Sequence, residues 1–241
     1  MSNAKLYLCS FSALMLIGCT PTATDSAETE TGTDTVASET VADEVSLHPK
    51  LADVAAATYS IEPTHAFLTV TVGHNAGISD YRISFTNFNG NLVFDPNTPE
   101  TSELSVSIDA TTVETNYPGN YKATHENSQW ASWNEDVSRN TKWLNSDTHP
   151  VISFNSTEIA VTGDLTGTVT GDLTLLGTTK PVTLDVTYNG VANPPWFNGR
   201  DVIGFDATTT LKRSEFGMGA YIPNIGDEVE VTFSGEFLQD E

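Results

Sequence analysis

The sequence is poor in cysteine and in positive charge. Its two cysteines, Cys9 and Cys19, both lie near the N-terminus of a chain of 241 residues. Lys and Arg together number 10 against 32 Asp and Glu, which gives a net charge of -22. Because such a surface repels phosphate groups, we exclude nucleic acid as a partner and attribute the acidity to solubility.

Common catalytic and cofactor motifs are also missing. The sequence contains no G-x-S-x-G, no H-E-x-x-H and no Gly-rich phosphate loop. His65 and His74 flank one alternating segment, so at roughly 3.3 Å per residue they stand ~30 Å apart, too far to bind one metal ion together. His125 or His149 could join either one only through the fold. We therefore expect no enzyme, no metal site and no cofactor, and histidines that hydrogen-bond to the backbone.

The apolar run of residues 6–18 is too short to span a bilayer but has the length of a signal-peptide core. It ends in Leu16-Ile17-Gly18-Cys19, which resembles the lipobox of bacterial lipoproteins, where small residues flank the cut and a thiol attacks the lipid. We predict a lipoprotein signal peptide over residues 1–18 and a lipid anchor, with palmitate among its acyl chains, on Cys19. An ordinary signal peptide with an accidental cysteine is the alternative.

The residues after the anchor suggest a location and a spacer. An Asp in place of Thr20 would resemble the signal for retention at the inner membrane, so its absence favours the periplasmic side of the outer membrane. Residues 19–57 are mainly Thr, Ala, Ser, Glu and Asp. Because this segment buries too little apolar surface to offset its chain entropy, we predict a flexible, acidic tether.

Residues 58–240 have the alternating residue pattern of a folded β domain. Short runs such as "LTVTV" and "EVEVTF" alternate apolar and polar residues and are separated by Gly, Asn, Asp and Pro. This pattern predicts antiparallel strands with one apolar face, in a sandwich or an up-and-down barrel. If about eight strands close into a barrel, the interior is either packed solid or wide enough for one slender, apolar ligand.

Residues 125–147, "HENSQWASWNEDVSRNTKWLNSD", interrupt the alternation. Trp130, Trp133, Val137 and Leu144 recur near helical spacing, and Asn127 or Ser128 is a suitable N-cap. We predict one amphipathic helix here. It either forms a lid over an open end of the barrel or covers a sheet edge.

Several ordered motifs resemble the YceI-like family. "EPTHAFLTVTVGH" matches that family's opening Asp-Pro-x-His-Ser signature, with Glu62 for the Asp and Ala66 for the Ser. "FTNFNGNLVFD", "HPVISFNST", "GDLTLLGTTKPVTLDV", "KRSEFGMG" and "IGDEVEVTF" follow in the family's order. The match covers about residues 58–238. It departs from the family between Thr115 and Lys142, at what would be the ligand entrance.

The resemblance implies an extended, lipocalin-like antiparallel barrel whose apolar tunnel holds an isoprenoid lipid, such as a quinone tail or a polyprenyl lipid. Homodimers occur in that family, so a homodimer is one arrangement that it implies. The expected function is therefore a membrane-tethered binding or carrier protein. An enzyme or redox partner acting on the bound lipid, and a ligand-free structural or stress-response lipoprotein, are the alternatives. The predicted tunnel residues are Leu68, Val70, Val72, His74, Phe85, Phe88, Leu92, Phe94, Val106, Ile108, Trp130, Trp133, Phe154, Leu173, Leu175, Leu184, Arg213 and Phe216.

Two of these residues have alternative roles. His74 is in register with Leu68, Val70 and Val72, so its ring could bond the polar head of a ligand at the tunnel mouth. Arg213 lies next to a turn, where it would either contact that polar end or form a salt bridge with one of the many carboxylates.

Overall fold

The structure is a computed structural model and describes residues 50–241. The predicted signal peptide, the anchor at Cys19 and residues 19–49 of the predicted tether lie outside the described residues. Val54, inside the segment predicted as a tether, is only 7% exposed. Leu51 also packs against the core.

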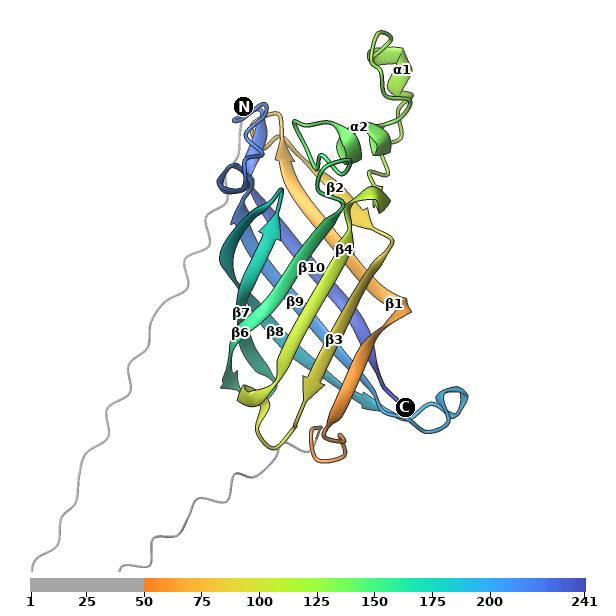
Figure 1. Ribbon diagram of the computed structural model, residues 1–241, viewed down its shortest axis with the longest axis vertical. Helices are drawn as coiled ribbons and strands as arrows, with labels where there is room; N and C mark the ends of the chain where they lie inside the picture. The colour runs from red at the N-terminus through yellow and green to blue at the C-terminus, as the bar shows by residue number, and fades with distance from the viewer. Residues whose placement is uncertain (1–49) are drawn as a thin grey trace, which may run out of the picture. The chain divides into compact units, whose positions relative to one another are not determined.

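The described chain forms ten antiparallel strands in one sheet that closes on itself (Figure 1). The strands are β1 (Ala57–His74), β2 (Ser79–Phe85), β3 (Phe88–Phe94), β4 (Glu103–Asp109), β5 (Val113–Glu114), β6 (Val151–Gly163), β7 (Thr166–Leu175), β8 (Thr178–Ala192), β9 (Val202–Lys212) and β10 (Ile225–Gln239). The sheet order is β10-β9-β8-β7-β6-β4-β3-β1-β2-β5, and β10 also pairs with β1. The closed ring has eight strands, which confirms the predicted antiparallel barrel.

Strand β1 is the seam of this barrel. One of its edges pairs with β10 along nearly the whole strand. The other edge pairs with β3 near the start of β1 and with β2 over Leu68 to His74. The register with β10 shifts twice, once between Val72 and His74 near the end of β1 and once in the middle, where residues 62–65 form an irregularity between the pairs Ile61–Phe237 and Ala66–Gly235.

The two ends of the barrel differ. We call the end that carries the β1–β2, β7–β8 and β9–β10 turns and the segment between β5 and β6 the mouth (Figure 1). We call the opposite end, with the β3–β4, β6–β7 and β8–β9 connections, the base. Short 3-10 helices at Pro99–Thr101, Ala110–Thr112, Pro195–Phe197 and Arg213–Phe216 complete these connections.

The predicted helix is much shorter than the pattern indicated. Within residues 125–147 the structure has only α2 (Trp133–Arg139), and α1 (Tyr121–Thr124) precedes this segment. The N-cap of α2 is Ser132, whose side chain accepts from Glu135 N. The prediction of Asn127 or Ser128 as N-cap is therefore wrong. Ser128 Oγ instead accepts from the Trp130 backbone, which holds the chain in a turn ahead of the helix.

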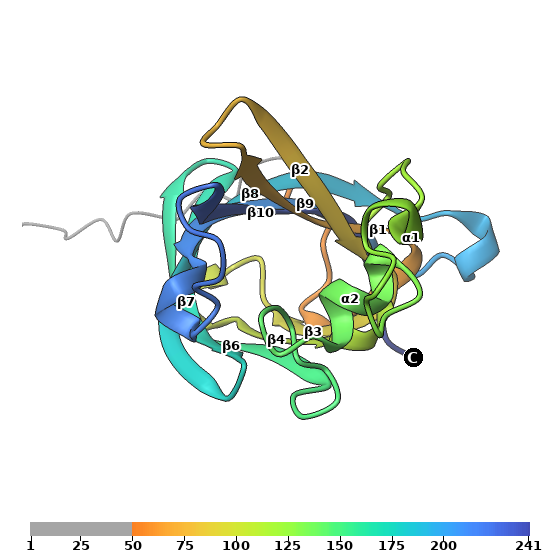
Figure 2. The same cartoon turned by 90° about the horizontal axis from the view of Figure 1, so that it is seen from above.

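Both interpretations of this segment hold in part. Viewed from above the barrel, α1 and α2 lie over one side of the ring of strands (Figure 2). The helix α2 also packs on β5, the last strand of the sheet order, where Asn134 Oδ1 accepts from Thr115 N at 2.9 Å. No helix within residues 50–241 has the length and apolar character that a membrane span requires.

Candidate binding site inside the barrel

The interior of the barrel holds a cavity of about 1130 Å³. It is hollow because strands with alternating patterns turn one apolar side chain in two toward the axis, and eight strands enclose more space than these side chains fill. In β1, Leu68, Val70 and Val72 line the cavity, whereas Phe67 on the opposite face is 70% exposed.

The structure brings together almost all of the predicted tunnel residues. The cavity is lined by Leu68, Val70, Val72, His74, Phe85, Phe88, Leu92, Phe94, Val106, Ile108, Trp130, Trp133, Phe154, Leu173, Leu175, Leu184 and Arg213. Phe216 is the exception. It is 2% exposed and belongs to the packed core without reaching the cavity, because it ends the 3-10 helix Arg213–Phe216 rather than standing on a strand.

Charged side chains line the cavity only near its two ends. Asp80, Asp136, Lys142 and Arg213 lie on the mouth side, and Asp164 lies in the β6–β7 turn at the base. The middle of the barrel is aliphatic and aromatic. Desolvating an unpaired charge is costly, whereas burying apolar surface is favourable, so the middle of the cavity suits a long apolar group and its ends tolerate polar atoms.

A cluster of aromatic rings forms one side of the mouth. The Trp133 ring lies 4.8 Å from Tyr117, 4.9 Å from Tyr121 and 4.7 Å from His125, measured between ring centroids. Tyr121 and His125 stack with an interplanar angle of 3°. The Tyr121 hydroxyl donates to Asp136 at 2.9 Å. These contacts place aromatic faces, with few free polar groups, along the entrance.

The mouth also contains residues that the sequence patterns did not single out. Tyr81, Tyr117, Tyr121, Met218 and Tyr221 line the cavity there. Four of them stand in loops or at a helix terminus, where no period-2 or helical pattern exists to assign a face. The available signal was compositional, since large aromatic residues in otherwise polar loops are candidates for a binding surface.

Arg213 has a structural role at the mouth. The side chain is 3% exposed, and its guanidinium donates to the carbonyl oxygens of Gly226, Met218, Ala220 and Ile225 at 2.6–2.9 Å. The salt bridge, one of the two predicted roles, is therefore wrong: two backbone carbonyls of the β9–β10 connection and two at the start of β10 take the place of a carboxylate. Burial lowers the pKa of Arg213, and the charge of Asp227 acts in the opposite direction.

The base is held by a buried carboxylate. Asp201 is 6% exposed, and its Oδ2 accepts from Ala55 N at 2.7 Å and from the Tyr59 hydroxyl at 3.2 Å. The Tyr188 hydroxyl donates to Lys50 O at 2.9 Å. Burial, followed by the charge of Asp201, raises the pKa of Tyr188 to about 12. These bonds fasten residues 50–55 across the base of the barrel.

The structure agrees with one expectation about the histidines and differs from another. His74 lines the cavity at the mouth, as its register with Leu68 predicted. His65 and His125 do not rely on backbone partners, because His125 Nδ1 lies 2.9 Å from Thr124 Oγ1 and His65 Nδ1 lies 2.6 Å from Glu62 Oε2.

Known proteins resemble this chain in sequence and in fold. The YceI-like domain matches residues 59–237. A UPF0312 protein of Ectopseudomonas mendocina is 33% identical over 186 residues, which cover 76% of this chain and 88% of that protein. The crystal structure of Burkholderia cenocepacia BcnA superposes with a TM-score of 0.60 and 21% identity, covering 75% of this chain and 99% of that one.

A polyisoprenoid binding domain from Saccharophagus degradans, implicated in plant cell wall breakdown, superposes with a TM-score of 0.50 and 15% identity, covering 76% of this chain and 98% of that one. These structural likenesses establish the shared barrel. The match of the domain over residues 59–237 covers well over half of the chain and carries the assignment. The chain belongs to the YceI-like family.

Proposed function

We propose that this protein binds an isoprenoid lipid, of quinone or polyprenyl type, inside its barrel and acts as a carrier or store for it. The observation that supports this most directly is the cavity of about 1130 Å³, whose middle is lined by apolar side chains. That volume is slightly above the usual range for small-molecule sites, ~300–1,000 Å³, and it is enclosed by a barrel rather than cut into a surface.

Affinity for such a ligand follows from its apolar length. Each CH₂ group moved from water into the cavity contributes ~0.8 kcal/mol, so a long isoprenoid needs no specific polar contact to bind tightly. A polar head would lie at the mouth, near His74, where polar side chains begin. The name of the Saccharophagus degradans domain, which describes polyisoprenoid binding, favours the same ligand class.

The proposal includes a membrane tether. The lipobox-like residues Leu16-Ile17-Gly18-Cys19 favour lipidation of Cys19, and Thr20 favours the periplasmic side of the outer membrane. A ligand with negligible solubility in water must be taken up from a membrane, so tethering near one suits a carrier. Labelling with a radioactive fatty acid in a bacterial host, with Cys19→Ser as the control, tests the anchor. Label that persists in Cys19→Ser would contradict it.

The first experiment identifies the ligand. The full-length protein is purified, its mass is measured by native mass spectrometry, and an organic extract is analysed beside it. We expect one isoprenoid per barrel. A protein that is empty and also refuses added quinones and polyprenyl phosphates would overturn the proposal and leave a ligand-free structural lipoprotein. Chemical conversion of the bound lipid on incubation would instead indicate an enzyme.

A matched pair of variants tests whether the ligand occupies the cavity. Ala207 lines the cavity and its neighbour Thr208 is exposed on the outer face of β9. We expect Ala207→Trp to reduce ligand occupancy several-fold because the indole fills the middle of the tunnel, while Thr208→Trp leaves it unchanged. Equal occupancy in both variants, measured by native mass spectrometry, would place the ligand elsewhere.

A further inference from the structure

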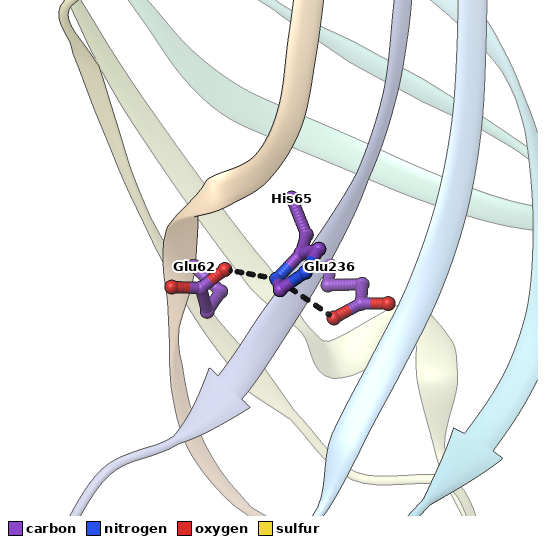
Figure 3. A group of neighbouring side chains, drawn as sticks. All are labelled: Glu62, His65 and Glu236. Atoms are coloured by element: carbon purple, nitrogen blue, oxygen red, sulfur yellow. Dashed lines mark hydrogen bonds and ion pairs between the residues drawn. The ribbon is translucent and has the colours of Figure 1, made fainter.

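Apart from the cavity, the outer surface of the barrel carries a cluster of metal-binding side chains. We propose that Glu62, His65 and Glu236 form a binding site for a divalent transition-metal ion of the Zn²⁺ type. The three side chains come from β1 and β10 and point toward one another across the seam (Figure 3). None of them lines the cavity, so the site does not depend on the proposed lipid.

The irregularity in β1 creates this cluster. Residues 62–65 lie between the pairs Ile61–Phe237 and Ala66–Gly235, so four residues of β1 face the single residue Glu236 of β10. The extra residues bend the strand and change the direction of the side chains that they carry. As a result Glu62 and His65, three positions apart, meet Glu236 at one point, which a regular strand could not achieve.

The donor atoms lie close enough together to share one ion. His65 Nδ1 lies 2.6 Å from Glu62 Oε2 and 3.8 Å from Glu236 Oε2, and one ligand atom from each residue lies within 4.8 Å of the others. A metal ion bound at ~2.0–2.2 Å from nitrogen and oxygen ligands fits among atoms with such separations after small side-chain adjustments. His65 and Glu236 are solvent-accessible, with side-chain exposures of 57% and 43%, so an ion has a path to the site.

The charge at this point also favours a cation. Two carboxylates, those of Glu62 and Glu236, meet here. Within residues 50–241, His65 is the ion-pair partner of both, and no Lys or Arg forms an ion pair with either carboxylate. Glu62 is 8% exposed. Glu62 is therefore a buried carboxylate with no Lys or Arg paired to it among residues 50–241.

Thr64 orients the site. Its hydroxyl donates to Glu62 Oε2 at 2.6 Å and its backbone N–H donates to the same oxygen at 3.2 Å. Such outer bonds fix the direction of a ligand carboxylate and are a regular feature of metal sites. One imidazole and two carboxylates suit Zn²⁺ better than Mg²⁺ or Ca²⁺, which prefer oxygen ligands alone.

An ion at this place would clamp the seam of the barrel. Three protein ligands leave at least one coordination position for water or for a ligand from another molecule. Because the ligands come from β1 and from β10, the first and last strands of the barrel, a bound ion links strands that are far apart in the sequence. Binding to the folded state alone then raises its stability.

The test uses the full-length protein, freed of metal with a chelator and titrated with ZnCl₂ by calorimetry and thermal unfolding. We expect one equivalent to bind and to raise the unfolding midpoint. His65→Ala and Glu236→Gln should each weaken binding at least about tenfold. Glu230→Gln is the matched control, because Glu230 is exposed on the same face of β10 and belongs to no such cluster, and it should bind as the unmodified protein does.

Several results would overturn the proposal. One is the absence of a saturable equivalent of Zn²⁺. Another is binding that Glu230→Gln weakens as much as Glu236→Gln, which would indicate diffuse attraction to an acidic surface. A third is binding that survives His65→Ala. Circular dichroism of each variant checks that the variant is folded, so that a loss of metal binding is not caused by unfolding. Replacing Zn²⁺ with Co²⁺ adds an absorption spectrum that reports a nitrogen ligand.

Discussion

The base and the mouth of the barrel are held by different kinds of side-chain contact. At the base, the carboxylate of Asp201 collects hydrogen bonds from residues 50–59 and from the β8–β9 connection. At the mouth, rings pack edge to face around Trp133, and within residues 50–241 the buried Trp133 Nε1 has no hydrogen-bond partner. The base is therefore held mainly by hydrogen bonds to one buried carboxylate, whereas one side of the mouth is formed by aromatic packing that hydrogen bonds such as that from Tyr121 to Asp136 support.

One part of the mouth resembles the base, and its loss should have the largest effect. Replacing the buried Arg213 with Met leaves four partly buried carbonyl oxygens without this donor, so we expect the free energy of unfolding to fall by about 3 kcal/mol. Urea unfolding measures this value. Lys212→Met, at the exposed neighbour, should cost less than about 0.5 kcal/mol. Equal losses in the two variants would mean that the carbonyls find water instead.

The base should make the larger contribution to alkaline sensitivity, although burial also raises the pKa of Tyr81 and of Tyr121 at the mouth. The pKa of Tyr188 is raised to about 12 from an ordinary value of 10.0, and burial and Asp201 raise the pKa of Tyr59 as well. Both tyrosines are therefore easier to ionise in the unfolded chain. Their contribution to stability is complete below pH 10 and is lost as the pH rises toward 12, at about 1.4 kcal/mol per pH unit for each tyrosine.

Unfolding free energies measured between pH 9 and about pH 11.5 check this slope. Tyr188→Phe should reduce this slope by the contribution of one tyrosine. Tyr221→Phe, at the exposed rim of the mouth, is the matched variant and should retain the full slope. A slope that Tyr188→Phe leaves intact would contradict the assignment of alkaline sensitivity to the base.

The smallest change is expected at Trp133. Because its Nε1 makes no hydrogen bond within the described residues, Trp133→Phe removes a buried, unsatisfied donor and keeps an aromatic ring. We expect the unfolding free energy to change by less than about 1 kcal/mol, in either direction, as measured by urea unfolding. A larger loss would show that the indole N–H is bonded in solution and that the mouth is as tightly held as the base.

The strands were predictable to a degree that the mouth was not. In "LTVTV" the alternation of Leu68, Thr69 and Val70 assigns each side chain to one face, and the structure places Leu68 and Val70 in the cavity. In residues 125–147, spacing suggested one long helix, and α2 has only seven residues. There, side chain–backbone bonds such as that of Ser128 compete with the helix, and a periodicity count does not register them.

The sequence by itself determined antiparallel strands with one apolar face, because period-2 alternation assigns faces without knowledge of the partner strands, whereas closure into a hollow barrel was decided by the pairing of β1 with β10. Only the tertiary structure decided that Arg213 is saturated by carbonyls, that Asp201 fastens the base, and that Glu62 and His65 meet Glu236 across the seam. These three arrangements join residues through loops and a strand irregularity. Their geometry depends on the register between distant segments, and no local pattern in the sequence encodes that register.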